Sequence, residues 1–273
     1  RIETGSADKS IIRDVQIENQ ASGIRHKSGA FDLIKCRVII RAALDFNSVF
    51  GLGAKGYSDG TADTVIIDGC TLLAEYSGNT PESTPPDVDI VLADSGAKYD
   101  TILVTNSNII NNLPNSIANG IEARQTSALL QILGNQIRCQ GMAIVPFDHV
   151  RSFDIRDNRI WSGTRGVIAS IDSPEQSTIA GNHITVEDLS LEVFPLHLQN
   201  YIAKRDSFCI GVAPGSAGIS AGFFHKAFVD RGTNIRIEDN VLAGNPKVGI
   251  SLADSPEPEN FGPPTPNYSN KNI

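Results

Sequence analysis

The chain has 273 residues, of which 40% are hydrophobic and 20% charged, and its formal net charge at pH 7 is -8. Hydrophobic residues suffice for a buried core, and no apolar run reaches the ~20 residues that a transmembrane helix needs. Because the acidic chain has no block rich in Lys and Arg, we expect no binding to nucleic acid, no membrane insertion and no unassisted binding of polyanions.

A short phrase recurs along the chain, in which apolar and polar residues alternate before a small polar residue and a further aliphatic residue. In chain order, diverged copies surround Val15, Cys36, Cys70 and Ser107, and clear copies cover 132–137, 153–160, 179–184 and 235–242. Period-two alternation places Ile235, Ile237 and Leu242 on one face of a strand. Each copy therefore predicts a short strand that is buried on one face.

A second phrase, usually a glycine followed by an aliphatic residue, lies between successive copies of the first. Its copies are Gly23-Ile24, Gly51-Leu52, Asp89-Ile90, Gly120-Ile121, Gly141-Met142, Gly166-Val167, Cys209-Ile210 and Gly249-Ile250. The intervals from Asn135 to Asn158 and from Asn158 to Asn182 are 23 and 24 residues, enough for three short strands and three turns. We therefore expect one all-β domain over 1–273, a solenoid of roughly eight to nine coils.

The small polar position of the first phrase becomes Asn in the second half of the chain, at Asn135, Asn158, Asn182 and Asn240. Stacked coils place like residues about 4.8 Å apart, so these amides should form a hydrogen-bonded ladder. The chain on these grounds resembles the right-handed parallel β-helices of the pectin-lyase-like superfamily, over essentially its whole length. A left-handed hexapeptide helix and a leucine-rich horseshoe fit worse, because the six-residue and Leu-x-x-Leu-x-Leu frames are absent.

The cysteines predict neither a metal site nor a cofactor. Cys36, Cys70, Cys139 and Cys209 show no Cys-x-x-Cys spacing. Cys36 and Cys70 should be neighbours in the ladder column, yet parallel stacking is poor geometry for a disulfide, so two free thiols are expected. We also expect the first half of this column to be held by small apolar packing rather than by amide bonding.

Interruptions of the repeat mark where a ligand would bind, because long loops in compact domains are frequently functional. Long excursions cover 73–88, 185–208 and 213–233, short loops cover 138–140 and 161–165, and a proline-rich segment covers 253–271. Residues 195–202 predict a short helix. Arg1 and the new repeat expected at Asn272 indicate a segment of a longer protein.

In the superfamily that the chain resembles, ligands lie over the Gly-aliphatic strands, which predicts a shallow trough there. Its floor should consist of the outward residues of these strands, namely Arg25, Val91, Glu122, Ala143, Ile168, Gly211 and Ser251. Glu122, Asp148 and His149 are the candidates for general acid and base, and Arg124, Arg151, Trp161 and Arg165 for substrate binding. Solvated ion pairs and turn capping are the alternative roles of these charged residues.

We therefore expect an extracellular β-helix that handles carbohydrate and has a polysaccharide or other glycan as its partner. As an enzyme it would be a polysaccharide lyase, a glycoside hydrolase or an epimerase. The alternative is a non-catalytic stalk, adhesin or spike segment, in the last case a homotrimer. The motifs of polygalacturonase-like chains are absent, and Phe147-Asp148-His149-Val150 lacks the Pro and second carboxylate of mannuronan epimerases. The fold resemblance therefore names no reaction.

Overall fold

A computed structural model describes residues 2–4, 9–19, 23–26, 29–41, 48–52, 63–75, 87–93, 99–113, 117–124, 128–147, 150–171, 175–187, 189, 207–214, 219–220, 223–224 and 235–252. The elements in this part of the chain are strands, and none of it forms a helix that could cross a membrane. The helix expected at 195–202 and the proline-rich segment 253–271 lie outside the described residues.

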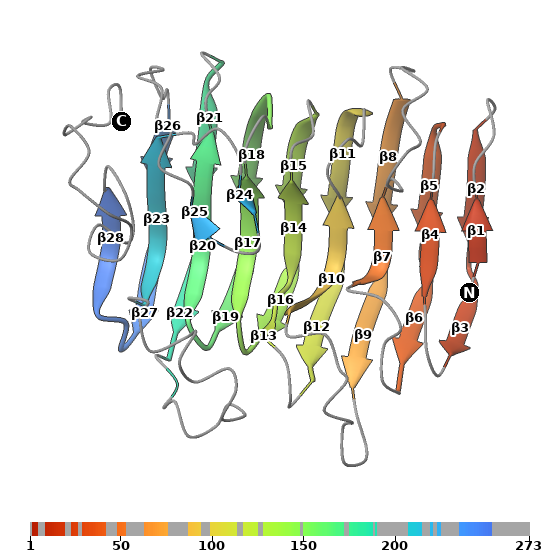
Figure 1. Cartoon of the computed structure of the whole chain (residues 1–273), viewed down its shortest axis with the longest axis horizontal. Helices are drawn as coiled ribbons and strands as arrows, with labels where there is room; N and C mark the ends of the chain where they lie inside the picture. The colour runs from red at the N-terminus through yellow and green to blue at the C-terminus, as the bar shows by residue number, and fades with distance from the viewer. Residues whose placement is uncertain are drawn as a thin grey trace.

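Three parallel sheets run the length of the molecule, with their strands side by side (Figure 1). Sheet A contains, in order, β1 (Ile2–Thr4), β4 (Ile24–His26), β7 (Ser48–Leu52), β10 (Asp87–Ala93), β14 (Ile121–Arg124), β17 (Met142–Phe147), β20 (Arg165–Ile171), β23 (Phe208–Pro214) and β28 (Val248–Leu252), and β13 (Ile117–Ala118) also pairs with β10. It holds the Gly-aliphatic phrases, and the other two sheets hold the two halves of the first phrase.

Sheet B contains β2 (Ser10–Arg13), β5 (Phe31–Ile34), β8 (Asp63–Asp68), β11 (Tyr99–Thr105), β15 (Leu129–Leu133), β18 (Ser152–Arg156), β21 (Ser177–Ala180) and β26 (Ile235–Glu238). Sheet C contains β3 (Gln16–Asn19), β6 (Arg37–Ile40), β9 (Thr71–Glu75), β12 (Asn108–Asn112), β16 (Gln136–Cys139), β19 (Arg159–Ser162), β22 (His183–Val186) and β27 (Val241–Gly244). Within the excursion 213–233, β24 (Ile219–Ser220) and β25 (Phe223–Phe224) pair antiparallel. The chain visits the three sheets in turn, so the expected solenoid of parallel strands is confirmed.

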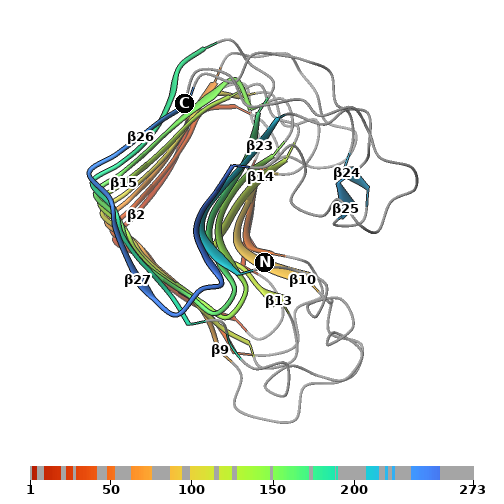
Figure 2. The same ribbon diagram turned by 90° about the vertical axis from the view of Figure 1, so that its left-hand side faces the viewer.

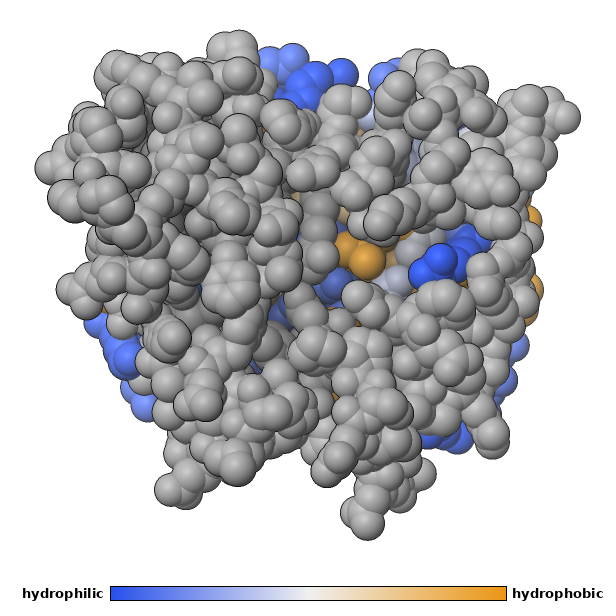
Figure 3. All heavy atoms as spheres, viewed as in Figure 1, coloured by the Kyte–Doolittle hydropathy of each residue, from blue (hydrophilic) through white to orange (hydrophobic). Residues whose placement is uncertain are grey.

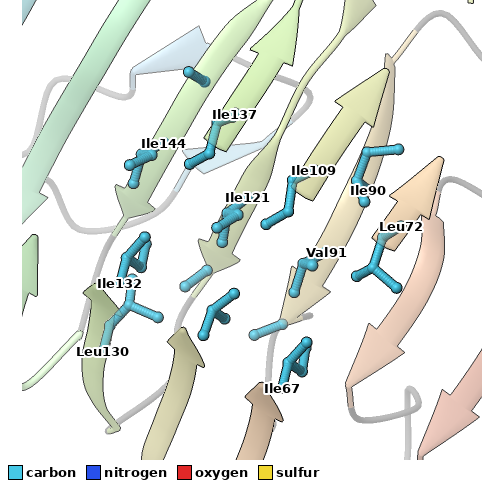
Figure 4. Packing of buried hydrophobic residues seen from close by; sticks show 14 of the residues in the cluster. Ile67, Leu72, Ile90, Val91, Ile109, Ile121, Leu130, Ile132, Ile137 and Ile144 are labelled. Atoms are coloured by element: carbon cyan, nitrogen blue, oxygen red, sulfur yellow. The ribbon is translucent and has the colours of Figure 1, made fainter. Parts of the chain in front are cut away.

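Like residues stack on like residues in the core (Figure 4), which lies between the three sheets that Figure 2 shows end-on. Val104, Ile132 and Ile155 occupy one column of sheet B, and Ile109 and Ile137 face them from sheet C. All five side chains are at most 2% exposed. Close-packed aliphatic columns of this kind supply the main favourable free energy of folding.

The register of sheet A corrects part of the predicted floor. Val91 pairs with Ile121, and Ile121 pairs with Ile144, so these three residues form the inward column. Val91 and Ala143, both expected to point outward, instead belong to the buried core cluster. The misalignment arose because Asp89-Ile90 and Gly141-Met142 do not start their strands at the same register as Gly120-Ile121.

The ladder forms at the turn between sheets B and C. The side-chain oxygen of Asn158 accepts two hydrogen bonds from Asn135, one from the backbone N–H at 2.9 Å and one from the side-chain amide at 3.1 Å. The side-chain oxygen of Asn182 accepts the two corresponding hydrogen bonds from Asn158. Asn158 also donates to the carbonyl of Ile132 at 2.8 Å. The prediction of an amide ladder is confirmed.

In the first half of the chain, where small apolar packing was expected rather than amide bonding, bonds to a hydroxyl and a sulfur continue the ladder. The backbone N–H of Cys70 donates to the hydroxyl of Ser107 at 3.0 Å, and that of Cys36 donates to the sulfur of Cys70 at 3.4 Å. Cys36 and Cys70 are neighbours and free thiols. Burial raises the pKa of the Cys70 thiol to about 11, so it remains protonated at neutral pH.

A left-handed backbone conformation precedes every ladder position. The residues with positive φ directly before a ladder position are Asp14, Lys35, Gly69, Asn106, Gly134, Asp157, Gly181 and Asp239. Gly, Asn and Asp adopt this conformation at low cost, which explains the Gly-Asn and Asp-Asn pairs of the repeat. Lys35, with φ of 51°, is the exception in residue type.

Buried His26 predicts a pH-dependent stability. Its ring is 0% exposed, stacks on Phe31 with centroids 4.7 Å apart, and donates through Nε2 to the carbonyl of Gly29 at 2.6 Å. Burial lowers the pKa of His26 below its ordinary value of 6.5, against the raising effects of the Gly29 hydrogen bond and of the charge on Asp63. Its contribution to stability is therefore fully present above about pH 6.5 and is lost as the pH falls towards the lower, folded-state pKa.

We expect the free energy of unfolding to decrease between pH 7.5 and pH 5.5, as measured by urea denaturation followed by circular dichroism. The His26→Phe variant keeps a ring of similar shape and should lose this part of the pH dependence. Equal pH slopes in the two proteins would show that His26 is not the titrating group.

Candidate functional site

The predicted trough over sheet A has a buried floor in the described residues. The outward column contains Leu92, Glu122, Val145, Ile168 and Gly211, which are paired in register from β10 to β23. Glu122 is 1% exposed and Val145 is 0% exposed. In Figure 3, which views this side, a central opening shows hydrophobic and hydrophilic groups of described residues. These side chains therefore do not form an open binding surface.

Arg165 also lies on sheet A and is 1% exposed. Its guanidinium stacks on the Phe208 ring, 4.9 Å from the ring centroid. The ring in turn lies against Gly211, where an added Cβ would come within 2.3 Å of the Phe208 side chain. The lack of a side chain at Gly211 thus makes room for the Phe208 ring. The same ring packs with Met142, Val145 and Ile168 in a small apolar cluster.

The other residues predicted for the trough are not brought together in the described structure. Arg124 belongs to β14, but its side chain lies outside the described residues, as do Asp148 and His149 entirely. Arg151 stands before β18 in sheet B, half-buried, 3.5 Å from the Glu175 carboxylate and 3.4 Å from the Asp100 carbonyl. The proximity of Glu122, Asp148 and His149 therefore stays a prediction.

Trp161 lies on a different face from Arg165. The segment 161–165, expected to be a loop, contains the end of β19 and the first residue of β20, so Trp161 points out of sheet C while Arg165 belongs to sheet A. The indole is partly exposed and donates through Nε1 to Glu187 at 2.9 Å. Arg138, its neighbour on β16, places its guanidinium 4.9 Å from the ring centroid.

Around Trp161 a surface groove of about 650 Å³ follows the outer side of sheet C. We call it the sheet C groove, and it is lined by Asn108, Ile110, Gln136, Ile137, Arg138, Arg159, Ile160, Trp161, His183 and Thr185. Except for the inward Ile137 and Ile160, these residues fall into two columns that cross β12, β16, β19 and β22 in register. Figure 2 shows that the outer side of sheet C faces away from sheet A.

The sheet C groove carries basic side chains in a protein whose net charge is negative. Its described lining includes two arginines, a histidine and two carboxamides, and no Asp or Glu. Among the described residues, no carboxylate oxygen lies within 4 Å of a guanidinium nitrogen of Arg138 or Arg159. The groove can thus offer hydrogen-bond donors from both arginines, hydrogen bonds from the carboxamides, and one aromatic ring.

Sequence reasoning found Trp161 and missed Arg138, Arg159, Gln136 and His183. The signal was present, because each stands at an outward position of a clear copy of the first phrase. Arg138 and Trp161 occupy the same register of consecutive copies, as do Gln136, Arg159 and His183. The sequence prediction placed the site over the Gly-aliphatic strands and not on this face.

Comparisons with models of protein families, with curated proteins and with solved structures found no match to this chain.

Proposed function

We propose that this chain is a carbohydrate-binding β-helix and that the sheet C groove is its glycan site. The observation that carries the proposal is the partly exposed Trp161 at the centre of a groove otherwise lined mainly by hydrogen-bonding side chains. An aromatic ring suits the apolar face of a sugar, and carboxamides and guanidinium groups suit its hydroxyls.

Rigid support favours this assignment. Trp161 stands on a strand that is paired on both sides, its indole nitrogen is held by Glu187, and Arg138 stacks against its ring. A ring that is fixed in this way loses little conformational entropy when a ligand binds. Three inter-strand steps of about 4.8 Å give the groove an axial length of about 14 Å, enough for a short oligosaccharide.

Binding without catalysis is the activity that this groove supports. General acid or base catalysis of glycosidic cleavage needs carboxyl groups at the bond, and the described residues that line the groove include none. The second candidate, catalysis over sheet A, is favoured by the burial of two ionisable groups, Glu122 and Arg165, on the outer side of that sheet.

We further propose a right-handed coil of the pectin-lyase-like kind and an extracellular location, with a homotrimeric spike segment as the alternative architecture. Three parallel sheets and a ladder at the turn between sheets B and C support the first of these. The second follows from the proposed polysaccharide ligand. Small-angle scattering and sedimentation would distinguish a monomer from a trimer.

Replacement of Trp161 by Ala tests the proposed glycan site. We expect glycans that bind the wild-type protein on an array to bind Trp161→Ala about tenfold to hundredfold more weakly, because truncating a central tryptophan removes the main contact surface. Trp161→Phe should retain most of the affinity, since it keeps a ring. Both variants should melt within a few degrees of the wild type.

Unchanged affinity in Trp161→Ala would contradict the proposed site, and so would the absence of any glycan bound by the wild type. Assays for reducing ends and for unsaturated products, run on the same glycans, distinguish binding from the second candidate. Turnover that depends on Glu122 and not on Trp161 would place the function over sheet A.

A further inference from the structure

Two arginines and a histidine of the sheet C groove are arranged around one aromatic ring. Arg138 is the direct cross-strand neighbour of Trp161, Arg159 lies two residues before Trp161 on β19, and His183 pairs with Arg159 from β22. Side chains two residues apart on a strand point to the same face, so all four project outward together. Any ligand on the ring therefore meets the two arginine cations.

The two arginines are also available to a ligand. Both are exposed, and neither forms an ion pair within the described part of the chain. Arg138 is held against the Trp161 ring, which orients its guanidinium and leaves its N–H groups free to bind. Guanidinium groups form paired hydrogen bonds with carboxylate and sulfate oxygens, whereas sugar hydroxyls need no cation.

From this arrangement we infer that the sheet C groove selects glycans that carry anionic groups, carboxylate or sulfate, and binds them along the solenoid axis. The inference rests on the proposed glycan site and adds the chemical class and direction of the ligand. Net charge alone predicts repulsion of polyanions, since the whole chain carries -8. The groove differs locally, because the charged residues of its described lining at neutral pH are Arg138 and Arg159, and the Glu187 carboxylate beside them accepts a hydrogen bond from the Trp161 indole.

Direction follows from the order of the lining residues. The two outward columns run across four consecutive strands, from Asn108 and Ile110 on β12 to His183 and Thr185 on β22. Along a single strand the groove offers only two outward residues. An extended oligosaccharide therefore makes the most contacts when it lies across the strands, with Arg138 and Arg159 near the middle of its length.

Binding of three hexasaccharides, measured by isothermal titration calorimetry on the full chain, tests the inference. The probes are a carboxylated hyaluronan hexasaccharide, a sulfated heparin hexasaccharide and neutral maltohexaose. We expect the wild type to bind at least one anionic probe at least tenfold more tightly than maltohexaose, and this preference to shrink at high salt because ions screen exposed charges. The two anionic arms distinguish carboxylate from sulfate recognition.

Arg159→Gln is the main variant, because it leaves the Arg138–Trp161 stack untouched. It should weaken anionic binding at least tenfold and weaken the binding of maltohexaose much less, because glutamine still offers hydrogen bonds to hydroxyls, and Arg138→Gln should weaken the anionic probes likewise. Arg37→Gln is the matched control, since Arg37 is an exposed arginine in the same column of sheet C, outside the groove. It should bind like the wild type.

Equal affinity for neutral and anionic probes, or an Arg159→Gln variant with unchanged anionic binding, overturns the inference. If Trp161→Ala still loses binding in that case, the proposed glycan site stands without the charge selection. If the wild type binds none of the probes nor any glycan on an array, the proposed function and this inference fail together.

Discussion

Replacing Asn158 by Leu is expected to lower the free energy of unfolding by about 3 to 5 kcal/mol, because several buried polar groups lose their partners at once. Asn158 is 1% exposed, so water cannot replace its amide. The N–H of Asn135 would lose its acceptor, and the carbonyl of Ile132 would lose its donor. Urea denaturation followed by far-UV circular dichroism measures the loss.

Asn158→Ser is the control that separates hydrogen bonding from side-chain volume. The column already contains a serine, since Ser107 accepts from the N–H of Cys70 at 3.0 Å and donates to the Thr105 carbonyl at 2.7 Å. A serine at 158 should therefore keep the acceptor for Asn135 and cost about half as much as leucine. Equal losses in the two variants would mean that the ladder's hydrogen bonds do not determine its stability.

Gly166→Ala is expected to destabilise the protein by about 3 kcal/mol through steric overlap between coils. A Cβ at this position would lie 2.4 Å from the carbonyl oxygen of Cys209 and 2.4 Å from a methyl group of Ile184. Neither neighbour can withdraw easily, because Cys209 belongs to the next strand of sheet A and Ile184 is a buried core residue. The change in urea midpoint gives the measurement.

Gly249→Ala is the matched control, because Gly249 stands in the same phrase of the last strand of sheet A. There an added Cβ would meet only a Leu242 methyl group, at 3.9 Å. We expect a change within about 0.5 kcal/mol, or a small gain from the reduced freedom of the unfolded chain. A comparable loss at both positions would indicate that backbone propensity, and not contact between coils, accounts for the glycines.

The repeated phrases predicted the strands well because alternation and stacking are local requirements. Ile132, Ile155 and Asn158 stand where the repeat placed them, since each coil must present its apolar residues inward and close at the same turn. Register was predicted less well where a phrase began with Asp89-Ile90 or Gly141-Met142. There the strand extends beyond the phrase, so pairing with the neighbouring coil, and not the phrase itself, sets which residue points inward.

Of the residues that line the sheet C groove, only Trp161 was predicted from the sequence as a ligand contact. Its type marked it as a ligand platform, but the sequence placed it beside Arg165, which lies on another sheet. Arg138 and Arg159 carry no distinguishing motif, and each resembles any solvated residue at an outward position. Their place in a groove depends on cross-strand neighbours that are more than twenty residues away along the chain.

The amino-acid sequence by itself determined the solenoid of parallel strands, the buried columns and the asparagine ladder, because these repeat with the period of one coil. Only the tertiary structure decided which outward face is open. Glu122 and Arg159 are both charged residues at outward positions, yet the first is buried on sheet A and the second is exposed in the sheet C groove. Alternation along a strand specifies the side on which a residue lies, whereas its access to solvent depends on how the rest of the chain packs over that side.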